Sequence, residues 1–256
     1  MIGYRLSRTG VAGHPFYISS LGIGLWSVEE LCYFLYENPA LIDESVVGGS
    51  LTRWLTEEFH MNSTVLVMER SMKNGAGMGE ILLPLFRAAG YLEPFEIRSF
   101  QKRLQTMASG GAPLQLKMKG DALARNRKYG EAVSVYSQAE ENTRKGETKL
   151  LASILHNRGY ALMQLLHYEE AYRAFRRAFA LEETPKRKRD CLLAAALAKP
   201  REIFYDEAEE LEAGKEMIRE VLDTVDSFAV PPVTPPADLL KELQRIRQEY
   251  HSEAGN

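Results

Sequence analysis

The stretch Gly120-Asp121-Ala122-Leu123 returns 39 residues later (159 − 120) as Gly159-Tyr160-Ala161-Leu162. Tyr129-Gly130-Glu131-Ala132 returns at the same spacing as Tyr168-Glu169-Glu170-Ala171. The same spacing relates an aromatic pair and an alanine pair: Tyr136 with Phe175, and Ala139 with Ala178. Self-similarity at a fixed period is typical of a repeated supersecondary unit that stacks on its neighbours. This stretch therefore decides the fold.

Each repeated residue type has a physical role in a hairpin of two helices. Glycine and alanine permit close approach where the two helices cross, and we expect the aromatic to fill the gap between successive hairpins. The repeated positions are Leu116, Gly120, Leu123, Ala132, Tyr136 and Ala139 in the first copy, and Leu155, Gly159, Leu162, Ala171, Phe175 and Ala178 in the second. Pro185 closes the second copy.

This pattern resembles the tetratricopeptide repeat, over residues 113–185 only. The resemblance implies a mostly α protein whose hairpins form an α-α superhelix. The family period is about 34 residues, so about five extra residues are expected in the second helix of the first copy or its loop, around Glu141–Thr148. Lys186–Ala198 and Ile203–Phe228 suggest a third hairpin, with Pro200 at the break between its helices.

The resemblance also implies a binding site, because such stacks bind partners on a concave face lined by the first helix of each hairpin. The residues at those positions are Lys117, Asp121, Arg125, His156, Asn157, Tyr160 and Gln164. In the subclass that clamps a C-terminal carboxylate, a lysine and two asparagines hold the ligand. Lys117 and Asn157 agree with that pattern, but Asp121 would repel a carboxylate. The alternative is a solvated groove with no dedicated ligand.

Residues 1–110 are predicted to form an irregular helical region behind a short extended arm or β-hairpin, made of Met1–Leu6 and Phe16–Ser19. Ser27 and Glu30 form a capping box, with Glu30 reaching back to the Ser27 amide. Apolar spacing and helix-end signals predict five helices, at about 27–38, 50–59, 63–73, 79–89 and 93–108. Gly110-Gly111 ends the last of them, and Pro113 suits the first turn of the next.

We divide the chain into four parts: a helical region with a short arm at 1–110, the hairpin stack at 113–228, a linker at 229–236, and a terminal helix and tail at 237–256. The linker contains four prolines in six residues, which predicts an extended, semi-rigid segment. The terminal helix carries an apolar side made of Leu239, Leu240, Leu243 and Ile246.

The charge is unevenly distributed. The net charges of residues 1–100, 101–200 and 201–256 are −4, +9 and −8, which sum to the −3 of the whole chain. A basic middle predicts an acidic partner or internal pairing. The basic residues Arg173, Arg176, Arg177 and Lys186 to Arg189 could meet an acidic peptide, but the acidic stretch Asp206–Glu212 favours a self-paired face. Nucleic acid is disfavoured because few aromatics interleave with the charges.

Catalytic and cofactor motifs are absent from the sequence. The five histidines show no metal-ligand spacing, and no nucleophile elbow, Walker loop or kinase signature occurs. Gly75-Ala76-Gly77-Met78-Gly79 misses the dinucleotide spacing by one residue and fits a helix–helix loop. Cys32 and Cys191 are predicted to be buried thiols in a reducing compartment. The uncharged stretch Pro15–Val28 is too short and polar to span a bilayer.

These observations favour a cytoplasmic, non-enzymatic adaptor or scaffold that binds a protein or peptide in the groove, without a cofactor, a metal or a membrane. One alternative is a peptide-responsive transcriptional regulator with DNA-binding N-terminal helices, although a charge of −4 there argues against DNA. Another is an enzyme within residues 1–110, although no catalytic motif is found there. The sequence leaves the oligomeric state open.

Overall fold

A computed structural model describes residues 9–227, 241 and 243–248 of the chain. The described part is mostly helical, as predicted, and contains one small sheet. The elements are β1 (Phe16–Ile18), β2 (Ile23–Leu25), α1 (Val28–Glu37), η1 (Pro39–Leu41), α2 (Gly49–Phe59), α3 (Asn62–Lys73), α4 (Met78–Ala89), α5 (Pro94–Ser109), α6 (Gly111–Arg125), α7 (Tyr129–Asn142), α8 (Thr148–Gln164), α9 (Tyr168–Leu181), α10 (Pro185–Ala198), α11 (Arg201–Glu210) and α12 (Lys215–Asp226).

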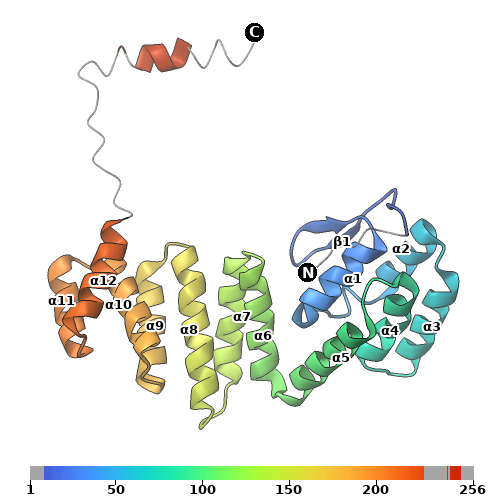
Figure 1. The fold of residues 1–256 in the computed structure, drawn as a ribbon, viewed down its shortest axis with the longest axis horizontal. Helices are drawn as coiled ribbons and strands as arrows, with labels where there is room; N and C mark the ends of the chain where they lie inside the picture. Colours follow the sequence, from blue (N-terminus) through green and yellow to red (C-terminus); the bar gives the residue numbers. More distant parts are fainter. Residues whose placement is uncertain (1–8, 228–240, 242, 249–256) are drawn as a thin grey trace.

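The repeat forms two adjacent helical hairpins, α6–α7 and α8–α9, which stand side by side in a row (Figure 1). This confirms the predicted stack of helical hairpins. The turns inside the two hairpins are alike, because Arg127 and Leu166, 39 residues apart, have φ angles of 60° and 62°. The left-handed conformation is uncommon for residues other than glycine. The repeat therefore extends to the backbone of the turn.

The helices of each hairpin cross at a glycine. A Cβ atom added to Gly120 would lie 2.6 Å from the ring of Tyr136, and one added to Gly159 would lie 2.8 Å from the ring of Phe175. We expected the aromatic to fill the space between hairpins. Each ring lies on the glycine of its own hairpin and also belongs to one buried cluster with an apolar residue of the next hairpin, Ile154 for Tyr136 and Leu192 for Phe175. The missing side chain leaves space for the ring, and a ring fills it completely.

The extra residues lie in the loop before α8 and at the start of α8, and not in the second helix of the first copy. Helices α7 and α9 both have 14 residues. The connection before α8 runs over residues 143–147, whereas the connection before α10 runs over residues 182–184. Helix α8 is also longer than α10, with 17 residues against 14. The insertion therefore lengthens the loop and the first turn of α8.

The third hairpin differs from the prediction, because Ile203–Phe228 does not form one helix. The chain turns between α11 and α12, with Glu212 at a φ of 49°. The turn brings Val221 and Leu222 of α12 into one apolar cluster with Leu192 of α10. A continuous helix would carry these apolar side chains away from α10 and into water, which is unfavourable.

The N-terminal region contains the five predicted helices, α1 to α5, with η1 after α1. The strand pairing differs from the expectation: β1 pairs with β2 in an antiparallel hairpin, and Met1–Leu6 lies outside the described residues. Gly22, at a φ of 67°, permits the tight turn that brings β2 back. The serine half of the capping box forms as predicted, but Glu30 accepts from the amide of Trp26 and not of Ser27.

The apolar core is continuous between the N-terminal region and the first hairpin. Phe86 of α4 and Phe100 of α5 belong to the same buried cluster as Leu123 of α6 and Tyr136 of α7. Helix α6 begins at Gly111, two residues before Pro113. The described residues of the predicted terminal helix are 241 and 243–248, where Leu243 and Ile246 are about half exposed. Leu239, Leu240 and the predicted linker lie outside the described residues.

Candidate peptide-binding groove

The seven groove residues predicted from the repeat lie on two neighbouring helices. Lys117, Asp121 and Arg125 are on α6, and the other four, His156, Asn157, Tyr160 and Gln164, are on α8. Their surroundings differ greatly. Four of them form side-chain contacts within the chain: Lys117, Asp121, His156 and Asn157. The other three lie nearer the ends of the two helices and are exposed: Arg125, Tyr160 and Gln164.

Asp121 is the centre of a polar network that joins three helices. Its Oδ1 accepts hydrogen bonds from the hydroxyl of Tyr136 at 2.8 Å and from the side-chain amide of Asn157 at 2.7 Å. Its Oδ2 lies 2.7 Å from Nζ of Lys117. Burial and the neighbouring Asp121 carboxylate raise the pKa of Tyr136, so the phenol keeps its proton. Asp121 thus occupies the two side chains, Lys117 and Asn157, that a carboxylate clamp would use.

His156 stands at the repeat position equivalent to Lys117 and is also engaged. Its Nε2 lies 3.5 Å from Oδ2 of Asp190 on α10, and its ring lies 5.2 Å from that of Phe175. Burial lowers the pKa of His156, with Asp190 opposing the shift. The ring is therefore neutral near pH 7 and is part of the contact between α8 and its neighbours.

Tyr160, Gln164 and Arg125 are exposed. The side chain of Tyr160 is 50% accessible, and its ring meets Tyr129 edge-on with centroids 6.5 Å apart. Arg125 donates to the carbonyl of Glu37 at 3.4 Å, which leaves its charge uncompensated. This end of the two helices offers a large aromatic surface and a positive charge to a partner.

Two further basic residues, Arg127 and Lys128, follow Arg125 in the turn between α6 and α7. In the part of the chain that the structure describes, none of the three forms an ion pair with a carboxylate. We did not single out Arg127 and Lys128 in the sequence. The signal was present as three basic residues within four positions at the end of a predicted helix.

The basic residues of α9 and α10 are largely paired within the chain. Arg176 bonds to Glu207 and Glu210 of α11, and Lys199 bonds to Glu207 at 2.6 Å. Arg177 pairs with Glu140, and Arg187 pairs with Glu182. The acidic stretch 206–212 is thus an internal partner of α9 and of the end of α10. From the run 186–189, the amine of Lys188 also reaches that stretch, through the carbonyl of Glu212 at 3.2 Å.

Comparison with protein families matches one segment of the chain. Residues 152–185 match the family profile described as Tetratricopeptide repeat. Residues 152–185 form a tetratricopeptide repeat. The match begins in α8, includes all of α9 and ends at Pro185, so it covers the second copy of the hairpin. Comparison of the chain with curated proteins and with solved structures gives no match.

Tetratricopeptide repeats are in general modules that bind other proteins or peptides, and they are typically not enzymes. Of the groove residues, His156, Asn157, Tyr160 and Gln164 lie within the matched segment, whereas Lys117, Asp121 and Arg125 precede it. None of the helices that the structure describes is both long and apolar enough to cross a bilayer. No group of three or more metal-ligating side chains occurs among the described residues.

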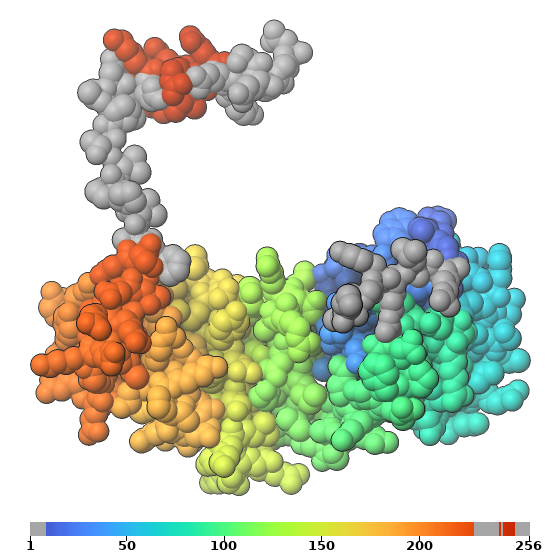
Figure 2. Space-filling model, viewed as in Figure 1, coloured from blue at the N-terminus to red at the C-terminus, as the bar shows by residue number. Residues whose placement is uncertain are grey.

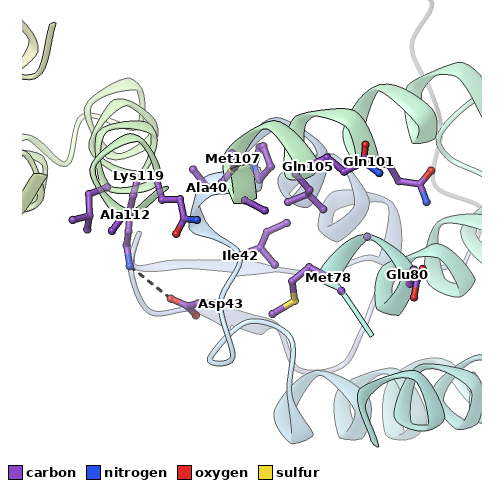
Figure 3. Close-up of a pocket in the computed structure, with 17 residues that line it drawn as sticks. Ala40, Ile42, Asp43, Met78, Glu80, Gln101, Gln105, Met107, Ala112 and Lys119 are labelled. Atoms are coloured by element: carbon purple, nitrogen blue, oxygen red, sulfur yellow. Dashed lines mark ion pairs between the residues drawn. The ribbon is translucent and has the colours of Figure 1, made fainter. Parts of the chain in front are cut away.

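A cleft of about 790 Å³ lies between the N-terminal region and α6, ahead of the tetratricopeptide repeat (Figure 3). Its walls come from η1, the start of α4, α5 and α6. Apolar side chains dominate it, namely Ile42, Met78, Leu104, Met107 and Leu116. Nζ of Lys119 and Oδ2 of Asp43, 3.8 Å apart, face each other at one side. The stretch Gly75–Gly79 runs from the loop after α3 into the first residues of α4 and contributes Gly77 and Gly79 to the cleft.

Proposed function

We propose that the protein is a non-enzymatic adaptor or scaffold that binds a protein or peptide along α6 and α8. The tetratricopeptide repeat at residues 152–185 supports this class of function. The site consists of the exposed Tyr160 and Gln164 of α8 together with Arg125 of α6. The cytoplasm is the proposed compartment, because Cys32 and Cys191 are buried free thiols, which are typical of a reducing compartment.

The observation that carries the proposal is the contrast along the groove. Lys117, Asp121 and Asn157 satisfy one another, so they hold α6, α7 and α8 together and have little capacity left for a ligand. Tyr160, at the position equivalent to Asp121, is half exposed and has its neighbour Tyr129 beside it. Tyrosine and arginine are the residue types that most often dominate binding energy at protein interfaces.

The proposed partner segment is acidic and carries an apolar or aromatic residue. Arg125, Arg127 and Lys128 lie at the end of α6 and in the turn after it, next to Tyr129. A carboxylate-bearing segment would gain attraction from these three charges, and its apolar residue would cover the rings of Tyr129 and Tyr160. Because Arg125 and Arg127 are exposed and Lys128 is only partly buried, the attraction should weaken with added salt.

The test compares two exposed tyrosines of nearly equal accessibility, Tyr160 at 50% and Tyr205 of α11 at 49%. The full chain, the double variant Tyr160→Ala/Gln164→Ala and the control Tyr205→Ala are immobilised and exposed to lysate of the native cell. Proteins are quantified by mass spectrometry. We expect a set of proteins that is retained by the full chain and by the control and is lost, at least tenfold, from the double variant.

Equal retention by all three proteins would place the binding surface elsewhere. A third variant, Arg127→Glu/Lys128→Glu, tests the charge of the partner. It should release the same proteins, and these should also elute from the full chain as salt is raised. Release by salt without any effect of this charge reversal would contradict an acidic partner at this site.

A further inference from the structure

The terminal helix exposes its apolar side to solvent. Leu243 and Ile246 are 53% and 50% accessible, and both lie within the described residues 243–248. In the sequence, Leu239 precedes Leu243 by four residues, a spacing that continues the same side of a helix. An isolated helix of this length is marginally stable in water, and most helical stability comes from the packing of an amphipathic face. This helix therefore has an apolar side that needs a matching surface.

The cleft beside α6 has the lining that an amphipathic helix needs. Its five apolar side chains are all partly exposed, namely Ile42, Met78, Leu104, Met107 and Leu116. All of them except Met107 also pack against the main buried cluster, which holds the walls of the cleft in place. The two methionines are flexible and adapt to the shape of a partner. An apolar groove that takes one side of a helix is a recurring mode of peptide recognition.

The charges at the cleft also suit the terminal helix. The amine of Lys119 already lies 3.8 Å from the carboxylate of Asp43. Glu80, at the start of α4, also lines the cleft, and it is exposed and forms no ion pair in the part of the chain that the structure describes. Arg247 is four residues after Leu243, so it borders the apolar side of the helix. With that side in the cleft, its guanidinium lies at the rim and can pair with Glu80.

The connection is long enough for the helix to reach the cleft of its own chain. Side-chain contacts join α6 to α8 and α8 to α10, and α12 packs on α10. Neighbouring helix axes are about 8–10 Å apart and a helix of 12 residues is about 18 Å long, so a path across these helices and along α12 is about 30–35 Å. The eleven residues from Ser227 to Asp238 (238 − 227) span up to about 36–40 Å when extended. The prolines of this connection favour an extended form.

We propose that the terminal helix of the same chain, residues 238–250, binds in the cleft beside α6. Leu243 and Ile246 pack against the apolar walls of the cleft, and Arg247 pairs with Glu80. A short tether holds the helix near the cleft at an effective concentration of about a millimolar. An interaction too weak to join separate molecules is therefore sufficient within one chain. The cleft is thus closed by part of its own chain, at a site separate from the groove at Tyr160.

The first experiment records the contact and its source. A photo-crosslinking amino acid replaces Gln105 on the wall of the cleft or, as a control, Thr106, which is exposed on the same helix and does not line the cleft. An equal mixture of isotopically labelled and unlabelled full chain is irradiated, and crosslinked peptides are identified by mass spectrometry. We expect adducts between position 105 and residues 238–250 within single chains, and at least tenfold fewer from position 106.

Two variants of the terminal helix test which of its sides makes the contact. Leu243→Asp/Ile246→Asp should reduce the adduct at least tenfold, because it places charges in the apolar cleft. Gln244→Asp/Gln248→Asp adds the same charges to the other side of the helix and should leave the adduct unchanged. Equal loss in both variants, or no adduct from position 105 in the unmodified chain, would overturn the proposal. Adducts that join a labelled chain to an unlabelled one would assign the helix to a second copy and overturn it as well.

A charge reversal tests the pairing at the rim of the cleft. Glu80→Arg should reduce the adduct from position 105 about two- to fivefold, a small effect because exposed ion pairs are weak. Adding Arg247→Glu to that variant should restore the adduct, since the pair is then present with its charges exchanged. An adduct that is unchanged by Glu80→Arg, or that is not restored by the second substitution, would contradict the pairing of Arg247 with Glu80.

The second experiment measures competition for the cleft. A fluorescent peptide of residues 237–251 is titrated into the full chain and into Leu243→Asp/Ile246→Asp, and its anisotropy is recorded. The tethered helix no longer competes in the variant, so the variant should bind the peptide at least tenfold more tightly than the unmodified chain. Adding Met107→Asp on the wall of the cleft should abolish this binding, and circular dichroism checks that each variant is folded. Equal binding by the unmodified chain and the variant, or binding by neither, would overturn the proposal.

Discussion

In both hairpins of the repeat an aromatic ring packs on a glycine where the two helices cross, but only one of the two rings carries a hydroxyl group. In α6–α7 the ring on the glycine belongs to Tyr136, whose hydroxyl donates to Asp121 at 2.8 Å. In α8–α9 the ring belongs to Phe175, which has no hydroxyl, and the position equivalent to Asp121 holds Tyr160. The space-filling view shows the hairpins as adjacent, similar ridges (Figure 2).

The two hairpins therefore use the equivalent groove position differently. The hydroxyl of Tyr136 helps to fix Asp121, and Asp121 in turn engages Lys117 and Asn157. The first hairpin therefore uses its polar groove residues to hold the stack together. The second hairpin has an apolar ring at its crossing and leaves Tyr160 exposed. Asp121 thus has a structural role, whereas the equivalent Tyr160 is open to the partner proposed above.

The largest expected effect tests what the hairpins share. Gly120→Ala and Gly159→Ala should each lower the free energy of unfolding by about 1–3 kcal/mol, because the new Cβ overpacks against a ring. Alanine has a higher helix propensity than glycine, so a loss of stability would show that overpacking outweighs the gain in propensity. Gly130→Ala, where the Cβ meets nothing within 4 Å, is the control and should be neutral or stabilising. Chemical denaturation measures all three, and a stable Gly159→Ala would contradict the crossing.

The next effect tests what distinguishes the hairpins. Tyr136→Phe should lower the free energy of unfolding by about 1 kcal/mol, because Asp121 loses one of its hydrogen bonds. The loss should vanish when Asp121 is already alanine, which a double-mutant cycle in urea would show. Equal losses in both backgrounds would mean that the hydroxyl acts through another contact.

The smallest expected effect is a pH dependence of the stability that arises from His156 in the second hairpin. The pKa of His156 is lowered in the folded chain, so the unfolded chain takes up its proton first as pH falls. This part of the stability is present above the ordinary pKa of 6.5 and is lost as pH falls below it. The first hairpin has a lysine, Lys117, at the equivalent position in place of a histidine.

Thermal melting of the full chain and of His156→Gln at several pH values between about 5 and 8 measures this contribution. The two curves should differ above pH 6.5 and approach each other below it. The acidic groups with lowered pKa values, Asp43, Glu58 and Glu207, titrate at lower pH and affect both proteins alike. Parallel curves would show that protonation of His156 does not change the stability of the folded chain.

Local patterns predicted most of the fold. Ser27 marked the start of α1, Gly120 and Gly159 marked the crossings, and apolar spacing located α2 to α5 within a residue or two. The sequence did not predict the turn between α11 and α12, because charged residues at 209–212 fit a helix as well as a turn. It also missed β2, which pairs with β1 and is only three residues long.

The candidate site was predictable by position but not by role. The repeat located Lys117, Asp121, Asn157 and Tyr160 on the first helices of their hairpins. Only the structure shows that the first three bond to one another while Tyr160 does not join them, because that depends on distances across three helices. The sequence could not predict the cleft beside α6 for the same reason, since four separate segments form its walls.

The most direct test of the proposed groove records contact at Tyr160 itself. A photo-crosslinking amino acid is placed at position 160 and, in a matched control, at position 205, and the cells are irradiated. We predict a covalent adduct between the chain and a partner protein from position 160, reduced by Arg127→Glu/Lys128→Glu, and none of that protein from position 205. The same adducts from both positions, or none from position 160, would contradict a binding groove on α6 and α8.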